Sequence, residues 1–210
     1  MSLIESLKWR SATKKFNPTK KVSDSDVEQL IEAGNLAPTS AGLQPFKLVV
    51  VKNEKLRAQL TPASWGQGQI TEASHLLVFA VQTNPSTELI DNYVNRVAEV
   101  RNQDVASLDG LKDMINGFVS PMDEPTRKVW FAKQAYISMG TMISAASELK
   151  IDTCPIEGFD PIQYSEILNL NDQNLMPVCV LAIGYRSEED VFSKMDKVRK
   201  KRNDFVLEIN

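Results

Sequence analysis

The segment Thr153–Phe159 carries residue types that suit ligand binding. Its sequence is TCPIEGF. Pro155 removes one backbone donor and fixes φ, while Gly158, for which we expect a positive φ, permits conformations that a side chain would block. Between them, Ile156 and Glu157 are predicted to lie in a rigid turn whose N–H groups could bind the acceptor edge of a flat ligand. A plain turn between a helix and a strand is the alternative.

Basic residues form two clusters that are far apart in the sequence. The first contains Arg10, Lys14 and Lys15, and the second occupies residues 197–202, KVRKKR. Because guanidinium groups bind phosphate oxygens with two hydrogen bonds at once, the two clusters could converge on one phosphate. A solvated charged face is the alternative. A nucleic-acid surface is disfavoured, since no aromatic residue interleaves the second cluster.

A loop with the sequence GQGQ, at residues 66–69, begins like a dinucleotide-binding fingerprint. Position 71, however, is threonine where a third glycine is required, and no apolar strand precedes the loop. We therefore reject a Rossmann phosphate loop. The amides of Gln67 and Gln69 could instead contact the edge of a heterocycle, or the loop could be a plain turn.

Metal ligands and catalytic nucleophiles are poorly represented. His75 is the single histidine, and Cys154 and Cys179 are far apart without CxxC spacing. We therefore expect no metal site and no disulfide framework. Cys154 is a weak candidate nucleophile, because only one histidine exists to activate it.

The composition is that of an ordinary globular protein. The chain has 210 residues, 42% of them hydrophobic and 24% charged, with a net charge of −3. This charge gives no general attraction to nucleic acid or acidic membranes. Apolar runs are too short to span a membrane, and the N-terminus mixes charged with apolar residues, unlike a signal peptide. We expect one domain over residues 1–210, located in the cytoplasm.

Periodicity and capping patterns predict the elements that must position these residues. Helices are expected over 2–9, from the capping box at 23–26 to about residue 35, and over 54–60, 88–100, 111–118, 126–149 and 160–168. Buried strands are expected at 46–51, 76–81 and 178–183, and loops at 37–45 and 65–70.

The helix at 126–149 is apolar around much of its circumference. A helix of this kind is buried on more than one side, either in the core or at a subunit contact. Because long helical stretches separate the strands, we predict an α+β fold with one mixed sheet.

Six short segments, taken in their order along the chain, together match the motif pattern of one protein family. They are RSATKKF at 10–16, APTSAGLQPF at 37–46, EASH at 72–75, AKQAY at 132–136, PIEGF at 155–159 and KVR at 197–199. Nearly end to end, the chain resembles the FMN-dependent, oxygen-insensitive NAD(P)H nitroreductases and the related dihydropteridine reductases. The resemblance implies a mostly antiparallel sheet flanked by helices, and a homodimer with two FMN molecules at the subunit interface.

The resemblance also assigns roles to particular residues. Arg10 and Arg199, with Lys197 nearby, are expected to bind the FMN phosphate. Lys14 is expected to face the N1/O2 edge of the flavin, where negative charge collects on reduction. The backbone N–H of Glu157 is expected to face flavin N5, so Lys14 and this N–H group are the implied catalytic groups. The implied cofactor contacts are Arg10, Ser11, Ala12, Thr13, Lys14, Gln67, Gln69, Pro155, Ile156, Glu157, Gly158, Lys197 and Arg199, with Pro38, Thr39, Ser40 and Gln44 from the other subunit.

Three positions depart from the family pattern. Ala12 stands where a phosphate-binding serine is common, so Ser11 or the backbone must serve instead. Gly66 stands where an asparagine is common, and Gln69 occupies a position that is lysine in some members. Lys14 is then the main cation at the N1/O2 edge.

The expected activity is FMN-dependent oxidoreduction. NAD(P)H would dock over the flavin, transfer hydride to N5 and leave before a nitroaromatic, quinone or pteridine-like acceptor takes its place. Phe118 is the expected pocket-lining residue, with ordinary helix packing as the alternative. Dihydropteridine reductase-type activity and a non-catalytic FMN-binding domain are the alternative functions.

Overall fold

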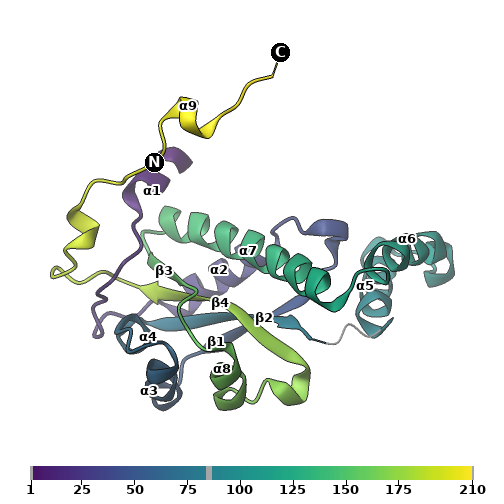
Figure 1. Cartoon of the computed structure of the whole chain (residues 1–210), viewed down its shortest axis with the longest axis horizontal. Helices are drawn as coiled ribbons and strands as arrows, with labels where there is room; N and C mark the ends of the chain where they lie inside the picture. Colours follow the sequence, from purple (N-terminus) through teal and green to yellow (C-terminus); the bar gives the residue numbers. More distant parts are fainter. Residues whose placement is uncertain (1, 84–86, 210) are drawn as a thin grey trace.

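The fold is built on a four-stranded sheet. A computed structural model describes residues 2–83 and 87–209 of the chain. The strand order is β1-β2-β4-β3, and all three strand pairs are antiparallel (Figure 1). The strands are β1 (Phe46–Val51), β2 (His75–Gln82), β3 (Asp152–Ile156) and β4 (Leu175–Gly184). The α+β prediction is confirmed.

The edge strands differ from what the sequence suggested. β1 was expected to be buried, but most of its side chains are only partly buried, because no strand covers its outer edge. β3 was expected to be part of a turn, but Asp152–Ile156 pairs with β4 in register from Asp152↔Gly184 to Ile156↔Val180. Pro155 is compatible with this position because an edge strand tolerates a missing backbone donor. The turn therefore begins only at Glu157.

Two long helices cover one face of the sheet. α2 (Asp24–Asn35) and α7 (Glu124–Glu148) pack side by side, and the Gly34 site leaves no room for a side chain, since a Cβ there would lie 2.8 Å from Met142. Buried residues of both helices join Leu77, Phe79 and Val81 of β2 in one core. α7 packs on the sheet along one stripe from Phe131 to Ala146, whereas Val129 and Ile137 are exposed, so one chain does not show the predicted burial on more than one side.

Three shorter helices cover the opposite face (Figure 1). They are α3 (Glu54–Ala63), α4 (Gln69–Glu72) and α8 (Pro161–Ile167). Their buried side chains pack against Leu76 and Val78, which alternate along β2 with the residues of the first core. This alternation is the period-two pattern of a sheet buried on both faces.

Two helices form a separate unit beyond one end of α7. α5 (Thr87–Arg101) and α6 (Asp109–Val119) are joined through a 3₁₀ turn, Val105–Leu108, and have a hydrophobic cluster of their own. Figure 1 shows them projecting to one side of the sheet. Leu43, from the loop before β1, is buried in this cluster.

The N-terminal helix and the tail after β4 lie near each other, and the tail then projects away from the sheet (Figure 1). α1 (Leu3–Trp9) begins with a Ser2–Glu5 capping box and packs against α7. The tail after β4 contains α9 (Arg202–Phe205), and Lys197 Nζ donates a 2.9 Å hydrogen bond to the carbonyl of Leu7. Further 3₁₀ turns are Ser40–Gly42, Asn171–Gln173 and Phe192–Lys194. Among the described helices, none combines the length and apolar character needed to cross a bilayer.

Candidate functional site

The segment that follows α1 lies along the outer edge of β3. Ala12 forms a parallel bridge with Thr153, and the N–H of Thr13 donates to the carbonyl of Thr153 at 3.1 Å. The hydroxyl of Thr13 also lies 3.4 Å from Asp152 Oδ1. This bridge is the one parallel strand contact of the described sheet, and it fixes the backbone of residues 10–13 beside β3.

The two basic clusters meet next to this segment. Burial and the nearby charge of Arg199 lower the pKa of Arg10, and burial together with Arg10 and Arg199 lowers the pKa of Lys197. A cation lowers the pKa of another basic group only when the two are close, so Arg10 shares one region of positive potential with residues about 190 positions away. Within the described residues, buried Arg10 Nε and Ser11 Oγ have no hydrogen-bond partner. Positive charge and two buried donors without partners therefore occur together in this region.

Arg186 is a cation at this site that the sequence reasoning missed. Its backbone N–H and its Nε donate to Asp152 at 2.8 and 2.7 Å, and its guanidinium lies 4.6 Å from the ring centroid of Trp9. The ion pair with Asp152 fixes Arg186 at the end of β4, and the charge of Arg186 also contributes to lowering the pKa of Lys197. Trp9 is also covered by Lys150, at 4.5 Å.

The side chains of Lys14 and Gln69, which lie 140 and 85 positions before Cys154 in the sequence, both approach its thiol. Lys14 Nζ lies 3.8 Å and Gln69 Nε2 3.9 Å from Cys154 Sγ. Burial raises the pKa of the Cys154 thiol, and the opposing effect of Lys14 is smaller. Cys154 is therefore a neutral, buried thiol at neutral pH, which does not suit a nucleophile.

The GQGQ loop packs against the turn after β3. Gln67 Nε2 donates to the carbonyl of Gly158 at 2.7 Å and to that of Ser64 at 3.1 Å. The positive φ expected for Gly158 is wrong, because the described glycines with positive φ are Gly42 and Gly66. A Cβ on Gly158 would instead lie 2.8 Å from Trp65 Cζ3, so glycine permits a close approach.

Glu157 uses its side chain to fix the turn. Its carboxylate accepts a 2.5 Å hydrogen bond from the hydroxyl of Tyr136, on α7. Burial and then this carboxylate raise the pKa of Tyr136. Pro155 and Glu157 are exposed, whereas Ile156 is buried in the second core.

Comparison with known proteins identifies the family. Residues 7–185 match the Nitroreductase family. The chain belongs to the nitroreductase family. A Staphylococcus haemolyticus protein named as an NAD(P)H nitroreductase is 35% identical over 215 residues, which cover 98% of this chain and 96% of that protein. A Bacillus subtilis protein with the same kind of name is 35% identical over 202 residues, 88% of each chain.

Solved nitroreductase structures have the same fold. A nitroreductase structure from Exiguobacterium sibiricum, solved in complex with FMN, has a TM-score of 0.84 at 22% identity and covers 100% of this chain and 98% of its own. The Bacillus subtilis protein ydfN has a TM-score of 0.87 at 22% identity, with 98% of each chain covered. The resemblance inferred from the sequence is therefore confirmed for the family and the fold.

In this nitroreductase, the loop Pro38–Gln44 lies away from the basic cluster. The N–H of Ser40 donates to Gln134 Oε1 at 2.8 Å, whereas Tyr136, two residues further along α7, faces Glu157. Residues two apart on a helix point in nearly opposite directions. One chain thus does not bring the loop to the same place as Arg10.

The loop nevertheless has features of a binding segment. Ala41 and Gln44 have positive φ values of 56° and 44°, and buried Thr39 Oγ1 has no hydrogen-bond partner in the described part of the chain. Gln44 Nε2 donates to the carbonyl of Asn35 at 2.8 Å. Pro38 is exposed.

Phe118 is on α6, 48% exposed, and its ring meets Trp130 edge-on with centroids 5.3 Å apart. A neighbouring cavity of about 370 Å³ is lined by Met122, Pro125, Thr126, Val129, Trp130 and Lys133. Phe118 thus combines helix packing with an exposed aromatic surface.

Proposed function

We propose that this protein is an FMN-dependent NAD(P)H oxidoreductase that reduces nitroaromatics, quinones or related acceptors. The observation that carries the proposal is the convergence of Arg10, Lys197 and Arg199 beside Lys14 and Gln69. Family membership and the FMN-bound structural neighbour support it.

The anion site fits the phosphate of FMN. Arg10 and Arg199 supply positive charges whose mutual repulsion an anion would relieve. Buried Arg10 Nε and Ser11 Oγ are donors without partners in the described residues, which a phosphate oxygen would satisfy. Ser11 therefore replaces the hydroxyl that Ala12 lacks, and Thr13 is excluded from this role because its hydroxyl faces Asp152.

Lys14 and Gln69 would meet the ring system rather than the phosphate. Both side chains lie within 4 Å of Cys154 on β3, the strand whose edge is bridged by Ala12, and Cys154 also contributes to the electrostatics of Arg10. Lys14 would stabilise negative charge on the ring edge, an interaction that strengthens as the charge develops. The turn at Glu157 is held by Tyr136, so its backbone has a fixed direction.

When bound, the flavin would take hydride from NAD(P)H and pass it to the acceptor after the nicotinamide has left. The protein residues therefore need only bind, orient and exclude water. This role explains why the site consists of donors and cations without an acid–base pair.

The loop Pro38–Gln44 would complete the site of a second subunit. The loop lies on a different side of α7 from Glu157 and carries an unpartnered buried hydroxyl at Thr39 within the described residues. A homodimer with FMN at the interface would place it over the ring of the partner's cofactor. Phe118 would border the acceptor pocket.

Anaerobic spectroscopy tests the proposal. The purified protein should be yellow, release FMN on denaturation, and lose its flavin absorbance when NADH or NADPH is added. A nitroaromatic or quinone should then restore the absorbance. A protein that binds FMN but is not reduced by either nicotinamide would be a binding domain, and one that binds no FMN would refute the cofactor assignment.

A further inference from the structure

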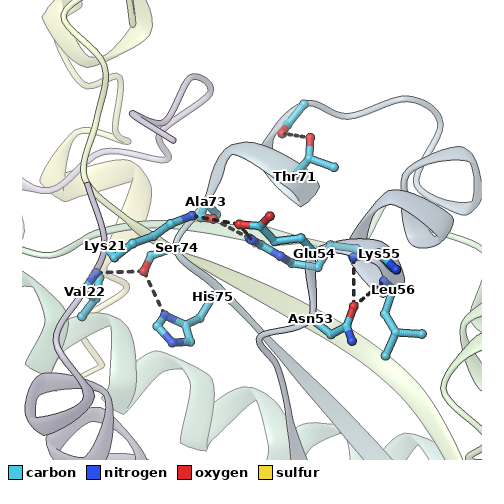
Figure 2. A network of polar contacts seen from close by, with 12 residues as sticks. Lys21, Val22, Asn53, Glu54, Lys55, Leu56, Thr71, Ala73, Ser74 and His75 are labelled. Atoms are coloured by element: carbon cyan, nitrogen blue, oxygen red, sulfur yellow. Dashed lines mark hydrogen bonds and ion pairs between the residues drawn. The ribbon is translucent and has the colours of Figure 1, made fainter. Parts of the chain in front are cut away.

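A second polar pocket is lined by residues other than those of the Arg10 and Cys154 site. It has a volume of about 440 Å³ and is bordered by the first residues of α2, the end of β1, the start of α3 and the start of β2 (Figure 2). Its lining residues are Lys21, Val22, Ser23, Asp24, Lys52, Glu54, Arg57, Ser74 and His75.

Arg57 forms the floor of this pocket and is a buried, incompletely paired cation. It is 1% exposed, and its Nη1 donates to the carbonyl of Ala73, at the end of α4. Its Nε has no hydrogen-bond partner within the described residues. Its nearest carboxylate, Glu54, lies 3.9 Å from Nη2, has a side chain that is 78% exposed and is also 3.7 Å from Lys21. Burial lowers the pKa of Arg57, as expected for a charge that is taken from water with little compensation.

The other charged residues leave the pocket positive. Lys21 and Lys52 lie at its rim with partly exposed side chains, and Lys52 pairs with Asp24 at 2.6 Å. Three cations, counting Arg57, against the two carboxylates Asp24 and Glu54 leave one net positive charge. The first residues of α2 and α3 add the positive ends of two helix dipoles.

His75 adds a hydrogen-bond donor. Ser74 Oγ accepts a 2.8 Å hydrogen bond from the N–H of Val22 and lies 2.9 Å from His75 Nδ1 (Figure 2). Burial, followed by the charges of Lys52 and Arg57, lowers the pKa of His75, so the ring is neutral at neutral pH. We assign the Ser74 proton to the hydrogen bond with Nδ1, which places the ring proton on Nε2. His75 then offers a donor in a pocket that also holds two ammonium groups.

We propose that this pocket binds a small oxyanion of the phosphate class. Arg57 provides a fixed positive charge at the floor, the two lysines provide mobile donors at the rim, and His75 provides a neutral donor. An oxyanion satisfies several donors at once and compensates the buried guanidinium. The site is separate from the cluster around Arg10, so it does not depend on FMN binding.

The single histidine of the chain gives a direct test. FMN-loaded protein without a histidine tag, whose cofactor site is already filled, is titrated with inorganic phosphate while the ring-proton NMR signals of His75 are followed. Chloride at matched ionic strength is the control for screening. We expect a saturable shift of these signals and a rise in the pKa of His75, because a bound anion stabilises the imidazolium.

Substitutions locate the binding. Arg57→Met and Lys52→Met should each weaken phosphate binding by about tenfold or more, the scale of one charge-assisted hydrogen bond. Lys55→Met is the matched control, because Lys55 is an exposed cation of α3 that does not line the pocket. The Lys55→Met protein should bind phosphate as tightly as the wild type. If Arg57→Met fails to fold, Lys21→Met and Lys52→Met decide the outcome.

Titration with glycerol phosphate distinguishes the source of the anion. Tighter binding than inorganic phosphate would identify the phosphate group of a larger molecule, and weaker binding would identify the free ion. The proposal is overturned if the wild-type signals show no saturable shift beyond the chloride control, or if Lys55→Met weakens binding as much as Lys52→Met.

Discussion

Replacement of Arg10 by methionine should weaken the binding of FMN without lowering the stability of the cofactor-free protein. In the absence of an anion, Arg10 is partly buried, lies near Arg199 and Lys197, and has no carboxylate partner among the described residues. The methionine side chain keeps the apolar packing but removes a charge that its neighbours repel. The free energy of unfolding of the apoprotein should therefore stay constant or rise.

The affinity for FMN should change in the opposite direction. Loss of one charge-assisted hydrogen bond costs about 1.5–3 kcal/mol, so the dissociation constant should increase roughly 10- to 150-fold. FMN fluorescence titration measures the affinity, and urea unfolding of apoprotein and holoprotein measures the stability. A bound ligand raises the free energy of unfolding in proportion to the logarithm of its affinity. The FMN-loaded variant should therefore lose about as much free energy of unfolding as it loses in free energy of FMN binding.

Lys200→Met is the matched control for this experiment. Lys200 belongs to the same basic segment, but its side chain is exposed. An equal loss of FMN affinity in Lys200→Met would show that only the general charge of the tail matters. A loss of stability in the Arg10→Met apoprotein would show that Arg10 is structural, and either result would refute the reasoning.

The FMN site, the buried His75 and the proposed dimer can each be tested by a further change or measurement. Lys14→Met should slow flavin reduction in stopped-flow experiments more than it weakens FMN binding, because Lys14 meets charge that develops during reduction; equal losses would contradict this. Glu157→Ala should keep bound FMN and much of the rate of flavin reduction. Gly158→Val should lose more of that rate, because its Cβ would lie 2.8 Å from the Trp65 ring. The reverse order of stopped-flow rates would show that the turn acts through the Glu157 carboxylate. Urea unfolding at a series of pH values should show that the free energy of unfolding falls as the pH drops below about 6.5, because burial lowers the pKa of His75 and the unfolded chain binds the proton first. If His75→Gln shows the same fall, other groups cause it. The protein should sediment as a dimer when it is loaded with FMN, since the Pro38–Gln44 loop is separated from Arg10 within one chain; a stable, FMN-loaded monomer would contradict the shared site.

Local signals predicted where most helices begin, although α3 extends to Ala63 and α4 begins inside the predicted loop at 65–70. Ser2, Ser23 and Asp160 each accept backbone hydrogen bonds as N-caps, and the capped helices begin where the sequence placed them. Caps depend on residues within one turn of the chain, so they are visible without tertiary contacts. The edge strand β3 was missed because its five residues contain a proline and its stability comes from pairing with β4.

Gly158 shows that a residue can be singled out correctly for the wrong reason. The sequence showed that glycine there was informative, but two causes favour glycine, a positive φ and a close approach. The structure shows the second cause, contact with Trp65. That contact joins residues 93 positions apart, so no local pattern distinguishes the two causes.

The arginines show most clearly what the sequence leaves undetermined. Arg10, Arg57 and Arg186 have the same chemistry, yet the fold gives each a different role. Arg186 is paired with Asp152, a residue 34 positions away, and so holds β4 in place. Arg10 and Arg57 each retain a buried Nε without a hydrogen-bond partner among the described residues. Arg186 has a buried counter-charge in Asp152, whereas Arg57 has the exposed carboxylate of Glu54 at 3.9 Å and Arg10 has no carboxylate partner among the described residues. Arg10 and Arg57 therefore mark the places where an anion would most stabilise the folded protein.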